Sequence, residues 1–369
     1  MRLNSTFQIG DSKIGTGHPA FIIAEISANH CGSFERAVEL IHAAKYAGAD
    51  AVKLQTYTAD TLTIDCDRAE FQIEGTIWNG QNLFDLYNTA HTPWDWQPKL
   101  KTVADNIGIE LFSSPFDPSA VEFLEQMEVP AYKIASFEIG DVELLCAVAR
   151  TGKPVILSTG MAELEEIDFA IDTLCENGAA GIAVLKCTSA YPSPPESMNI
   201  KTIAAMIDRY GWPCGLSDHS LTHDAAIASV CVGGSIIEKH LTLSRDEGGP
   251  DAAFSLEPLE FAEMVHRVRS IEKTLGTVQF GPCESDRSNR VFRRSLFVVK
   301  DVRAGESFTR ENVRSIRPGH GLEPRFLAEV LGKKATQSIQ RGTPLTWDHL
   351  PTSESRLHQT NATAVRTHA

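Results

Sequence analysis

The sequence lacks the motifs that mark several common classes of enzyme and membrane protein. It has no GxSxG elbow and no Walker motif, so acyl transfer by a serine nucleophile and ATP hydrolysis are poor candidates. The sequence contains no run of about 18 apolar residues, the length needed to cross a bilayer. The N-terminal MRLNSTFQIG has no apolar signal-peptide region. We therefore expect a cytoplasmic protein.

Paired cysteines are also missing. The eight cysteines show no CxxC spacing and no small secreted framework surrounds them. None of them stands in a recognisable nucleophile motif. We therefore expect reduced thiols that are mostly buried.

Positive charge is scarce in the chain as a whole but not in every part of it. The 34 Lys and Arg against 48 Asp and Glu give a net charge of −14, which argues against a general binder of nucleic acid or anionic membrane. Between Arg287 and Leu350, however, 13 Lys and Arg stand against 6 Asp and Glu. The remainder of the 369 residues is therefore more acidic than the total suggests. With 42% hydrophobic and 22% charged residues, the composition is that of an ordered globular protein.

The first three quarters of the chain alternate short apolar runs with amphipathic stretches, which is typical of βα units and a parallel sheet. The candidate strands are FIIAEIS (from Phe21), AVKLQTY (from Ala51), IELFSSPF (from Ile109), AYKIAS (from Ala131), PVILSTG (from Pro154), IAVLKCTS (from Ile182), PCGLSDHS (from Pro213) and SIIEKHLTL (from Ser235). Eight such units in roughly 250 residues predict an α/β fold of the (β/α)8 TIM-barrel class. A doubly wound open sheet is the alternative, but no GxGxxG follows the first strand.

One connection in this pattern is unusually long. The stretch from Thr58 to Pro93 exceeds a plain βα loop and contains Trp78 and Tyr87. We expect it to fold over the barrel mouth, and we expect Trp94 and Trp96 to pack there rather than to stack on a sugar.

A change of pattern after residue 280 predicts a second, smaller domain. The polar segment GPCESDRSNR precedes FRRSLFVVKDVRAGESFTRENVRSIRPGHGL, whose pattern differs from that of the βα units. We divide the chain into a barrel domain at 1–280, a linker at 281–292 and a small domain at 293–351. Residues 352–369 lack an apolar period, and we expect a disordered tail.

Polar side chains recur at the carboxyl ends of the predicted strands, where the reacting groups of a TIM barrel converge. They are Glu25, Ser27, Lys53, Gln55, Lys133, Ser136, Ser158, Lys186, Thr188, Ser189, Ser217, Asp218, His219, Glu238 and His240. A lysine buried in a barrel is costly unless it is paired with an anion, so Lys53 and Lys133 indicate a bound phosphate or carboxylate. The alternative is that each lysine pairs with a barrel glutamate such as Glu25 or Glu238.

Two histidines end adjacent predicted strands. His219 in GLSDHS and His240 in IIEKHLTL would face one point in the barrel mouth, which suits a divalent metal such as Mn, Fe, Co or Zn with open positions. Asp251, in the glycine-rich loop after the last strand, is a candidate third ligand or water orienter. The alternative is that the histidines are hydrogen-bonded core residues or general bases.

Taken in order, the motifs resemble those of the sialic acid synthase family. The motifs are KLQTYTADT, SSPFD, YKIASFEI, STGMA, KCTSAYPSP, GLSDHS, IEKHLTLSR and SLEP, and the small domain resembles the antifreeze-like (SAF) module of these enzymes. The family condenses phosphoenolpyruvate with an N-acetylated aldose. Within it, TIWNGQNLFDLYNTAHTPWDW and KIASFEI resemble pseudaminic acid synthases more than N-acetylneuraminate synthases, which implies 2,4-diacetamido-2,4,6-trideoxy-L-altrose as the acceptor.

The resemblance also implies roles for individual residues. The residues matched to phosphoenolpyruvate binding are Lys53, Lys133, Ser136, Ser158 and Ser217. Those matched to the acceptor and metal region are Glu25, Gln55, Tyr191, Glu238 and Asp251, and Glu138 matches a general base. Ser189 stands where N-acetylneuraminate synthases have asparagine, a departure that fits a different sugar.

The resemblance further implies a metal and a partner subunit. His219 and His240 match the metal ligands, with Mn²⁺ as the usual ion and Mg²⁺ or Co²⁺ as alternatives. Arg317 matches an arginine that the SAF module inserts into the barrel of the other subunit, so a domain-swapped homodimer is expected. Opposite charges on the two domains would favour that docking.

Three rival functions remain open. The first is the same condensation on another aldose, giving legionaminic or N-acetylneuraminic acid. The second is a metal or Schiff-base aldolase that uses pyruvate and releases no phosphate. The third is a non-catalytic sugar-binding protein, which would have no need of paired metal ligands.

Overall fold

The computed structural model describes residues 6–351, which form two compact units that divide after Gly276. The tail predicted from residue 352 lies outside the described residues. Each unit is described here by itself.

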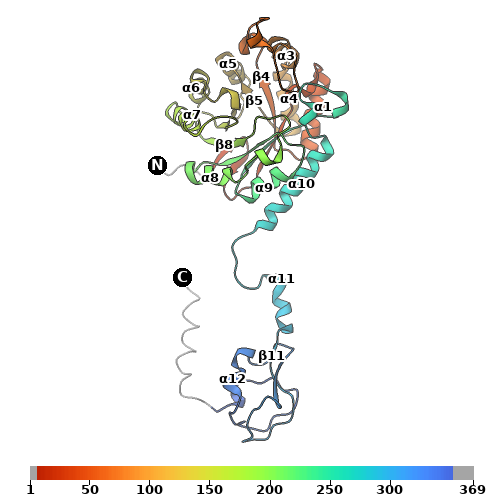
Figure 1. Cartoon of the computed structure of the whole chain (residues 1–369), viewed down its shortest axis with the longest axis vertical. Coiled ribbons are helices and arrows are strands. Elements are labelled where there is room, and N and C mark those ends of the chain that lie inside the picture. Colours follow the sequence, from red (N-terminus) through yellow and green to blue (C-terminus); the bar gives the residue numbers. More distant parts are fainter. Residues whose placement is uncertain (1–5, 352–369) are drawn as a thin grey trace. The chain divides into compact units, whose positions relative to one another are not determined.

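The first unit is a closed barrel of parallel strands surrounded by helices (Figure 1). Its strands are β3 (Phe21–Glu25), β4 (Ala51–Thr56), β5 (Glu110–Pro115), β6 (Tyr132–Ile134), β7 (Val155–Ser158), β8 (Ile182–Cys187), β9 (Cys214–Asp218) and β10 (Ile236–His240). The register runs without a break around the ring, and β10 closes it by pairing with β3 from Ile236 opposite Phe21 to His240 opposite Glu25. This closure confirms the TIM-barrel prediction and excludes the open sheet.

The helices around the barrel follow the predicted βα order. They are α1 (Phe34–Tyr46), α4 (Gln97–Ile107), α5 (Pro118–Gln126), α6 (Val142–Arg150), α7 (Leu164–Glu176), α8 (Thr202–Tyr210), α9 (Asp224–Cys231) and α10 (Pro258–Leu275). Ser33 caps α1 by accepting a hydrogen bond from the Arg36 amide. Within residues 6–351, no helix is both long enough and apolar enough to cross a bilayer.

The barrel core is apolar on both faces of the strands. All five residues of β3 are buried, as are the residues of β7, β9 and β10. Such strands read as continuous apolar runs because helices cover their outer face while side chains fill the interior. The few polar residues in these strands are therefore expensive to bury, and they mark the site.

An N-terminal hairpin was not predicted from the sequence. Strands β1 (Thr6–Ile9) and β2 (Ser12–Gly15) pair antiparallel, with Ile9 and Ile14 fully buried. The Asp11 amide donates to Glu110 at the start of β5. The hairpin therefore lies at the amino ends of the strands, away from the end where the site forms.

The long connection after β4 contains two short helices. They are α2 (Ala59–Leu62) and α3 (Leu83–Ala90). Asn82 fixes the start of α3, because its side chain accepts from the Phe84 amide at 2.8 Å and donates to the Cys66 carbonyl at 2.8 Å. These bonds fix the connection internally, and Trp78 ties it to the loop after β10 by donating to the Pro250 carbonyl at 2.9 Å.

The second unit has its own small apolar core. It contains α11 (Glu284–Arg287), the antiparallel pair β11 (Ser295–Val298) and β12 (Val313–Ile316), and α12 (Leu327–Val330). The core includes Leu296, Val298, Phe308, Val313 and Leu345. Several single β-bridges, such as Val302 with Ile339, complete the unit.

The cysteines differ from the prediction. All eight are free, but only Cys187 and Cys214 are buried. Cys231 is the last residue of α9, and Cys175 lies one residue before the end of α7, where side chains reach solvent. The prediction that most of the thiols are buried was wrong, because helix ends tolerate a small apolar residue at the surface.

Candidate active site

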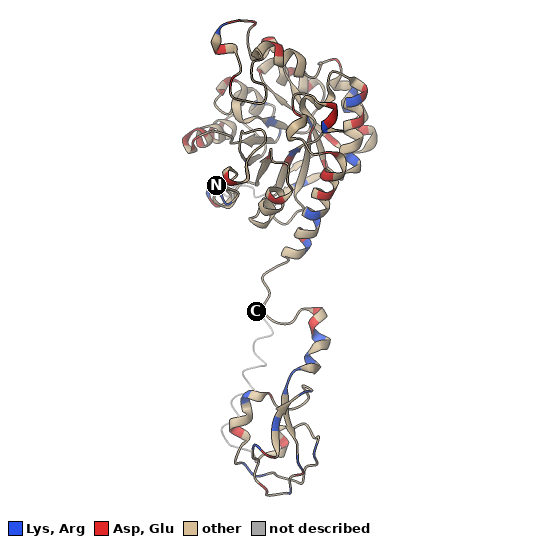
Figure 2. Ribbon diagram, turned by 45° about the vertical axis from the view of Figure 1, so that its right-hand side comes forward, with Lys and Arg blue, Asp and Glu red and all other residues tan. Residues whose placement is uncertain are grey.

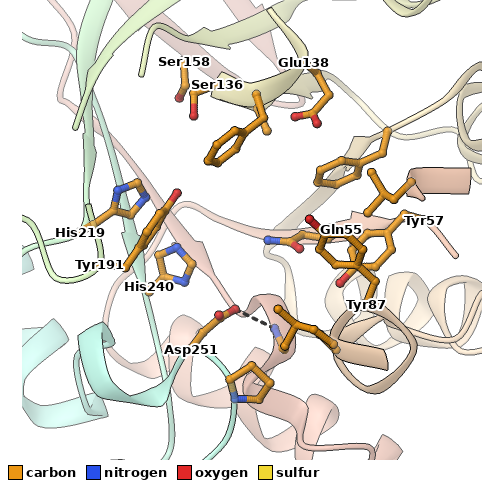
Figure 3. Close-up of a pocket in the computed structure, with 18 of the residues that line it drawn as sticks. Gln55, Tyr57, Tyr87, Ser136, Glu138, Ser158, Tyr191, His219, His240 and Asp251 are labelled. Atoms are coloured by element: carbon orange, nitrogen blue, oxygen red, sulfur yellow. Dashed lines mark hydrogen bonds between the residues drawn. The ribbon is translucent and has the colours of Figure 1, made fainter. Parts of the chain in front are cut away.

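A cavity of about 350 Å³ opens at the carboxyl ends of the barrel strands. Most of the residues predicted from the sequence line it. They are Lys53, Gln55, Lys133, Ser136, Glu138, Ser158, Tyr191, Ser217, His219, Glu238, His240 and Asp251. Several of these side chains point into one space in Figure 3, as expected for parallel strands that end at one rim.

Alternation along β9 and β10 decides which side chains reach the cavity. Ser217 and Glu238 line it, whereas Asp218 and Lys239, the next residues, do not. Lys239 is fully buried and donates to Asp218 at 2.7 Å and to the Thr222 carbonyl at 3.0 Å. Successive side chains of a strand point to opposite faces, so one face supplies the site and the other a structural ion pair.

The floor of the cavity is a buried network of charged groups. Lys53 lies 2.7 Å from a carboxylate oxygen of Glu25 and 3.6 Å from one of Glu238. Lys133 lies 3.9 Å from Glu238, which also accepts a hydrogen bond from Ser217 at 3.0 Å. The alternative raised for the lysines, pairing with barrel glutamates, is therefore present in the structure. The long Lys133 contact leaves that ammonium available to a further anion.

The two glutamates of this network have pKa values shifted in opposite directions. It raises the pKa of Glu25 to about 7, although Lys53 opposes the shift. Burial also opposes the ionisation of Glu238, but Lys133 and Lys53 outweigh it and hold the pKa of Glu238 below its usual range. Glu238 is thus the ionised partner of both lysines, and Glu25 can hold a proton near neutral pH.

The two histidines present the same ring nitrogen to the cavity. Their ring centroids are 5.4 Å apart. Nδ1 of His219 bonds the Thr188 carbonyl at 2.9 Å, and Nδ1 of His240 lies 3.3 Å from the Ser27 hydroxyl. Both Nδ1 atoms are engaged, so a metal would be bound through Nε2 of each ring, and the His219 ring also interacts with the Cys187 thiol. Burial holds the pKa of His240 well below its usual value, which keeps the ring in the neutral form that binds metals.

This donor set fits a divalent ion held by two imidazoles, with the other positions left to substrate and water. Across residues 6–351, no group of three or more His, Cys, Asp or Glu side chains is arranged to hold a metal. Asp251 lines the cavity, but its carboxylate accepts from the Ala28 amide at 3.3 Å. The suggestion that Asp251 is a third ligand is therefore not supported, whereas a water-orienting role is compatible with its place.

Glu138, Ser136 and Ser158 lie along one edge of the cavity, across from Asp251 (Figure 3). Burial raises the pKa of Glu138 to about 7, with Lys133 opposing the shift, and its Oε2 has no hydrogen-bond partner. The hydroxyl of Ser158 is also buried without a partner, while Ser136 bonds Ser189 at 3.0 Å. These unsatisfied groups are suited to bind a substrate oxygen or a water molecule.

The glycine of the STG motif keeps this corner open. Gly160 has a φ of +49°, and a Cβ there would lie 2.2 Å from the Cβ of Ser136. It would also lie 2.8 Å from the hydroxyl of Ser189. Only glycine fits, because both the backbone angle and the space exclude a side chain.

Three of the residues to which the resemblance gave a role do not line the cavity, and neither do four of the polar strand-end residues, namely Ser27, Lys186, Thr188 and Asp218. Glu25 lies beneath it and accepts from Gln55 at 3.0 Å, and Ser189 supports Ser136 from behind. Arg317 belongs to the second unit, where it lines a separate hollow of about 590 Å³. Three further arginines, Arg294, Arg310 and Arg314, line the same hollow.

The structure also brings residues to the cavity that the sequence reasoning did not single out. Tyr57, Phe116, Cys187 and Phe254 line it, together with apolar residues of α3. Trp78 and Tyr87 line it too, as expected of a connection that folds over the barrel mouth. Tyr57 and Phe116 follow β4 and β5 directly, and that position was the signal that could have found them.

The two tryptophans after this connection do not line the cavity, as expected. The Trp94 ring packs on Phe123 with centroids 4.7 Å apart, and Trp96 packs edge-on against His30 and Phe34. Both rings therefore help to attach the long connection to the barrel.

Comparison with known proteins agrees with this geometry. Residues 40–280 match the NeuB family, and residues 293–351 match the SAF domain. The chain belongs to the NeuB family. This confirms the resemblance to sialic acid synthases and the presence of a SAF domain after the barrel.

Named relatives cover nearly the whole of this NeuB-family chain. It is 44% identical over 338 residues to the pseudaminic acid synthase of Campylobacter jejuni, covering 92% of this chain and 98% of the relative. It is 33% identical to the N,N'-diacetyllegionaminic acid synthase of Legionella pneumophila, covering 91% of this chain and 96% of the relative. Among solved structures, the N-acetylneuraminic acid synthetase of Leptospira borgpetersenii in complex with citrate matches at 32% identity and a TM-score of 0.69. That match covers 77% of this chain and 94% of the other.

Proposed function

We propose that this NeuB-family protein is a pseudaminic acid synthase. It condenses phosphoenolpyruvate with 2,4-diacetamido-2,4,6-trideoxy-L-altrose to give pseudaminic acid and phosphate. The observation that carries the proposal is the cavity, in which two buried lysines and two histidines share one space at the barrel rim. The 44% identity to a pseudaminic acid synthase over 92% of the chain favours this acceptor over those of the more distant relatives.

The lysine side of the cavity suits phosphoenolpyruvate. Lys53 and Lys133 supply two buried cations, and the hydroxyls of Ser136, Ser158 and Ser217 lie near them on the strand ends. Lys53 and Lys133 both pair with the single carboxylate of Glu238. The phosphate and carboxylate of phosphoenolpyruvate would give these two lysines further anionic partners. Holding both anionic groups fixes the orientation of the C3 carbon, which is worth several kcal/mol of barrier.

His219 and His240 would hold the divalent ion through Nε2, and Mn²⁺ suits two imidazoles with oxygen ligands. When bound, such an ion supplies Lewis-acid polarisation of the acceptor aldehyde. The chain's own contribution is to keep His240 neutral by burial and to fix each ring through Nδ1. Mg²⁺ and Co²⁺ are the alternatives.

Glu138 is the proposed general base. In the reaction, the C2–C3 π electrons of phosphoenolpyruvate form the bond from C3 to the aldehyde carbon, the aldehyde C=O π bond breaks, and its oxygen takes up a proton. Water then adds to the electron-poor C2. Oε2 of Glu138, which has no hydrogen-bond partner in the structure, accepts the proton of that water, and this balances the proton taken up by the aldehyde oxygen. In the resulting phosphohemiketal, the bond between C2 and the phosphate oxygen then breaks, the C2 hydroxyl gives its proton to the leaving phosphate, and phosphate is released.

The remaining site residues are assigned to the acceptor. Gln55 and Asp251 line the cavity away from Ser136 and Ser158, whereas Tyr191 lies beside the histidines with its hydroxyl directed toward the two serines (Figure 3). Glu25 orients Gln55, and Glu238 neutralises the lysines. Ser189 acts by hydrogen-bonding Ser136. At the position of Ser189, the related N-acetylneuraminate enzymes carry asparagine.

The SAF domain is the basis for proposing a second subunit. We assign the barrel to 1–280, the linker to 281–292 and the SAF domain to 293–351, and we propose a domain-swapped homodimer. Arg317 would then complete the cavity of the other subunit, supported by the basic hollow that it shares with Arg294, Arg310 and Arg314. The cytoplasmic location expected from the sequence remains a prediction.

The test is phosphate release from phosphoenolpyruvate with Mn²⁺ and a panel of acceptors. The panel contains 2,4-diacetamido-2,4,6-trideoxy-L-altrose, the acceptor that gives legionaminic acid, N-acetylmannosamine, and no sugar. We expect the highest kcat/KM with the altrose. A higher value with another sugar would assign that product instead, and no phosphate with any sugar would overturn the proposal in favour of an aldolase or a binding protein.

A further inference from the structure

The cavity has two chemically different sides. Lysines, serines and histidines occupy the strand ends, whereas the opposite side is mostly apolar. Figure 3 shows His219 and His240 on one side, and Tyr57 and Tyr87 across the cavity from them. The apolar side, which we call the lid wall, consists of Tyr57, Leu83, Leu86, Tyr87, Ala90 and Phe116.

The side chains of the lid wall are held in place by contacts with one another. The Tyr57 ring packs edge-on against Phe116 and Tyr87, with centroids 5.1 and 5.9 Å away. Leu86 is buried on α3, and Asn82 fixes the start of that helix. Ligand pockets typically combine such an apolar surface with a few placed polar groups, so this surface is suited to recognise an apolar part of a ligand.

We infer that the lid wall selects an acceptor whose far end is apolar, by packing against the C6 methyl group of a 6-deoxy sugar. This inference rests on the proposed function. The aldehyde carbon of the acceptor must lie beside phosphoenolpyruvate at the lysine and histidine side. The other end of the sugar is then directed across the cavity, toward α3.

Different residues of the lid wall suit two different groups of the acceptor, the C6 methyl group and the C4 acetamido group. Leu83, Leu86 and Ala90 offer no hydrogen bond, so a C6 hydroxyl placed against them would lose its water without replacement. The only hydrogen-bonding groups of the lid wall are the phenols of Tyr57 and Tyr87. These suit the acetamido group at C4, whose carbonyl accepts a hydrogen bond while its methyl group packs on the rings.

The size of the effect is limited by the nature of apolar pockets. Such a pocket rejects an analogue that merely adds a hydroxyl by up to about 100-fold in kcat/KM. We therefore expect the wild type to prefer the 6-deoxy acceptor over its 6-hydroxy analogue, 2,4-diacetamido-2,4-dideoxy-L-altrose, by roughly 10-fold to 100-fold.

Two variants test the lid wall from within. Ala90→Ser adds one hydroxyl without removing packing, and Leu83→Asn places an amide at the half-buried start of α3. Ile64→Asn is the matched control, because Ile64 lies in the same connection, is 60% exposed and does not line the cavity. Thermal melts followed by circular dichroism establish that each variant is folded.

The measured quantity is the ratio of kcat/KM for the 6-deoxy and 6-hydroxy acceptors, from phosphate release. We expect Ala90→Ser and Leu83→Asn to lower the ratio several-fold, and Ile64→Asn to leave it unchanged. An unchanged ratio in either folded lid-wall variant, or equal use of both acceptors by the wild type, would overturn the inference alone. No phosphate release with either acceptor would instead overturn the proposed function, and the lid-wall inference with it.

Discussion

Glu138 combines burial, an unpartnered carboxylate oxygen and a pKa near neutrality. Burial is the main cause of the raised pKa, and Lys133 limits the rise. A carboxylate that fulfilled only a structural role would be expected to bond its second oxygen. The free Oε2 is therefore more consistent with a group kept ready for a proton than with one that holds the fold together.

We predict opposite effects of Glu138→Gln on activity and on stability. The folded-state pKa of about 7 lies above the ordinary value of 4.5, so the carboxyl group favours folding when protonated, and this contribution is lost as pH rises between these values. The substitution should raise the free energy of unfolding at pH 8 by on the order of 1–3 kcal/mol. It should lower kcat by about 100-fold or more.

Urea unfolding at pH 5 and pH 8, together with phosphate release, checks both effects. The gain in stability should be larger at pH 8 than at pH 5, because only then is the wild-type carboxylate charged in the folded state. Full activity of the variant would remove Glu138 from the reaction, whatever its stability.

At the same scale, His240→Ala tests the metal assignment. We expect the variant to keep its circular dichroism spectrum and to lose both turnover and most of its Mn²⁺ affinity, because an imidazole with a free Nε2 is removed. Titration with Mn²⁺ followed by electron paramagnetic resonance measures the affinity directly. Wild-type affinity in the variant would contradict the assignment.

The sequence predicted the strand-end residues of the site well, and the lid wall poorly. Side chains at the carboxyl ends of parallel barrel strands converge on one rim, so the positions of Lys53, Lys133 and His240 in the site could be predicted from the sequence. Leu83 and Ala90 lie on a short helix in a long connection, and no periodicity shows where such a helix will dock. The support by Ser189 and the position of Glu25 beneath the cavity depend on packing that a single sequence does not show.

At the scale of elements, each barrel strand serves two purposes through its alternating faces. Ser217 on β9, His219 directly after it, and Glu238 and His240 on β10 line the cavity, while Asp218 and Lys239 form a fully buried pair behind them. The pair joins two adjacent strands just behind the histidines. Stability of this pair and geometry of the site are therefore coupled through the same two strands.

We predict that Lys239→Met strongly destabilises the barrel. Removal of one partner leaves the Asp218 carboxylate buried and unpaired, which costs about 3–5 kcal/mol. Lys99→Met is the matched control, because Lys99 pairs with Asp95 on the surface and should cost no more than about 1 kcal/mol. Urea unfolding of both variants measures the difference, and equal costs would show that the buried pair is not needed.

At the scale of the whole molecule, charge is divided between the two units. Acidic residues mark many of the helices around the barrel, whereas the second unit carries more Lys and Arg than Asp and Glu (Figure 2). The overall charge of −14 hides this division. Opposite charges on the two units would favour the proposed docking of the SAF domain on the barrel of a partner. The net charge of −14 argues against a general binder of nucleic acid.

Subunit mixing tests the shared site. Arg317→Ala and the isosteric Glu138→Gln should each be inactive as homodimers. After mixing and exchange, a mixed dimer would join an intact barrel of one chain to an intact Arg317 of the other. With random pairing, about a quarter of wild-type activity should return. If no activity returns although exchange is shown by mass, Arg317 does not act across subunits.

The fate of oxygen in the released phosphate tests the central claim most directly. The reaction is run in H₂¹⁸O with phosphoenolpyruvate, Mn²⁺ and 2,4-diacetamido-2,4,6-trideoxy-L-altrose, and phosphate and product are analysed by mass spectrometry. A condensation in which water adds at C2 predicts phosphate that is equimolar with product, carries no ¹⁸O and appears only when the sugar is present. Phosphate that carries ¹⁸O, or that appears without sugar, would contradict the account, because it would show simple hydrolysis of phosphoenolpyruvate.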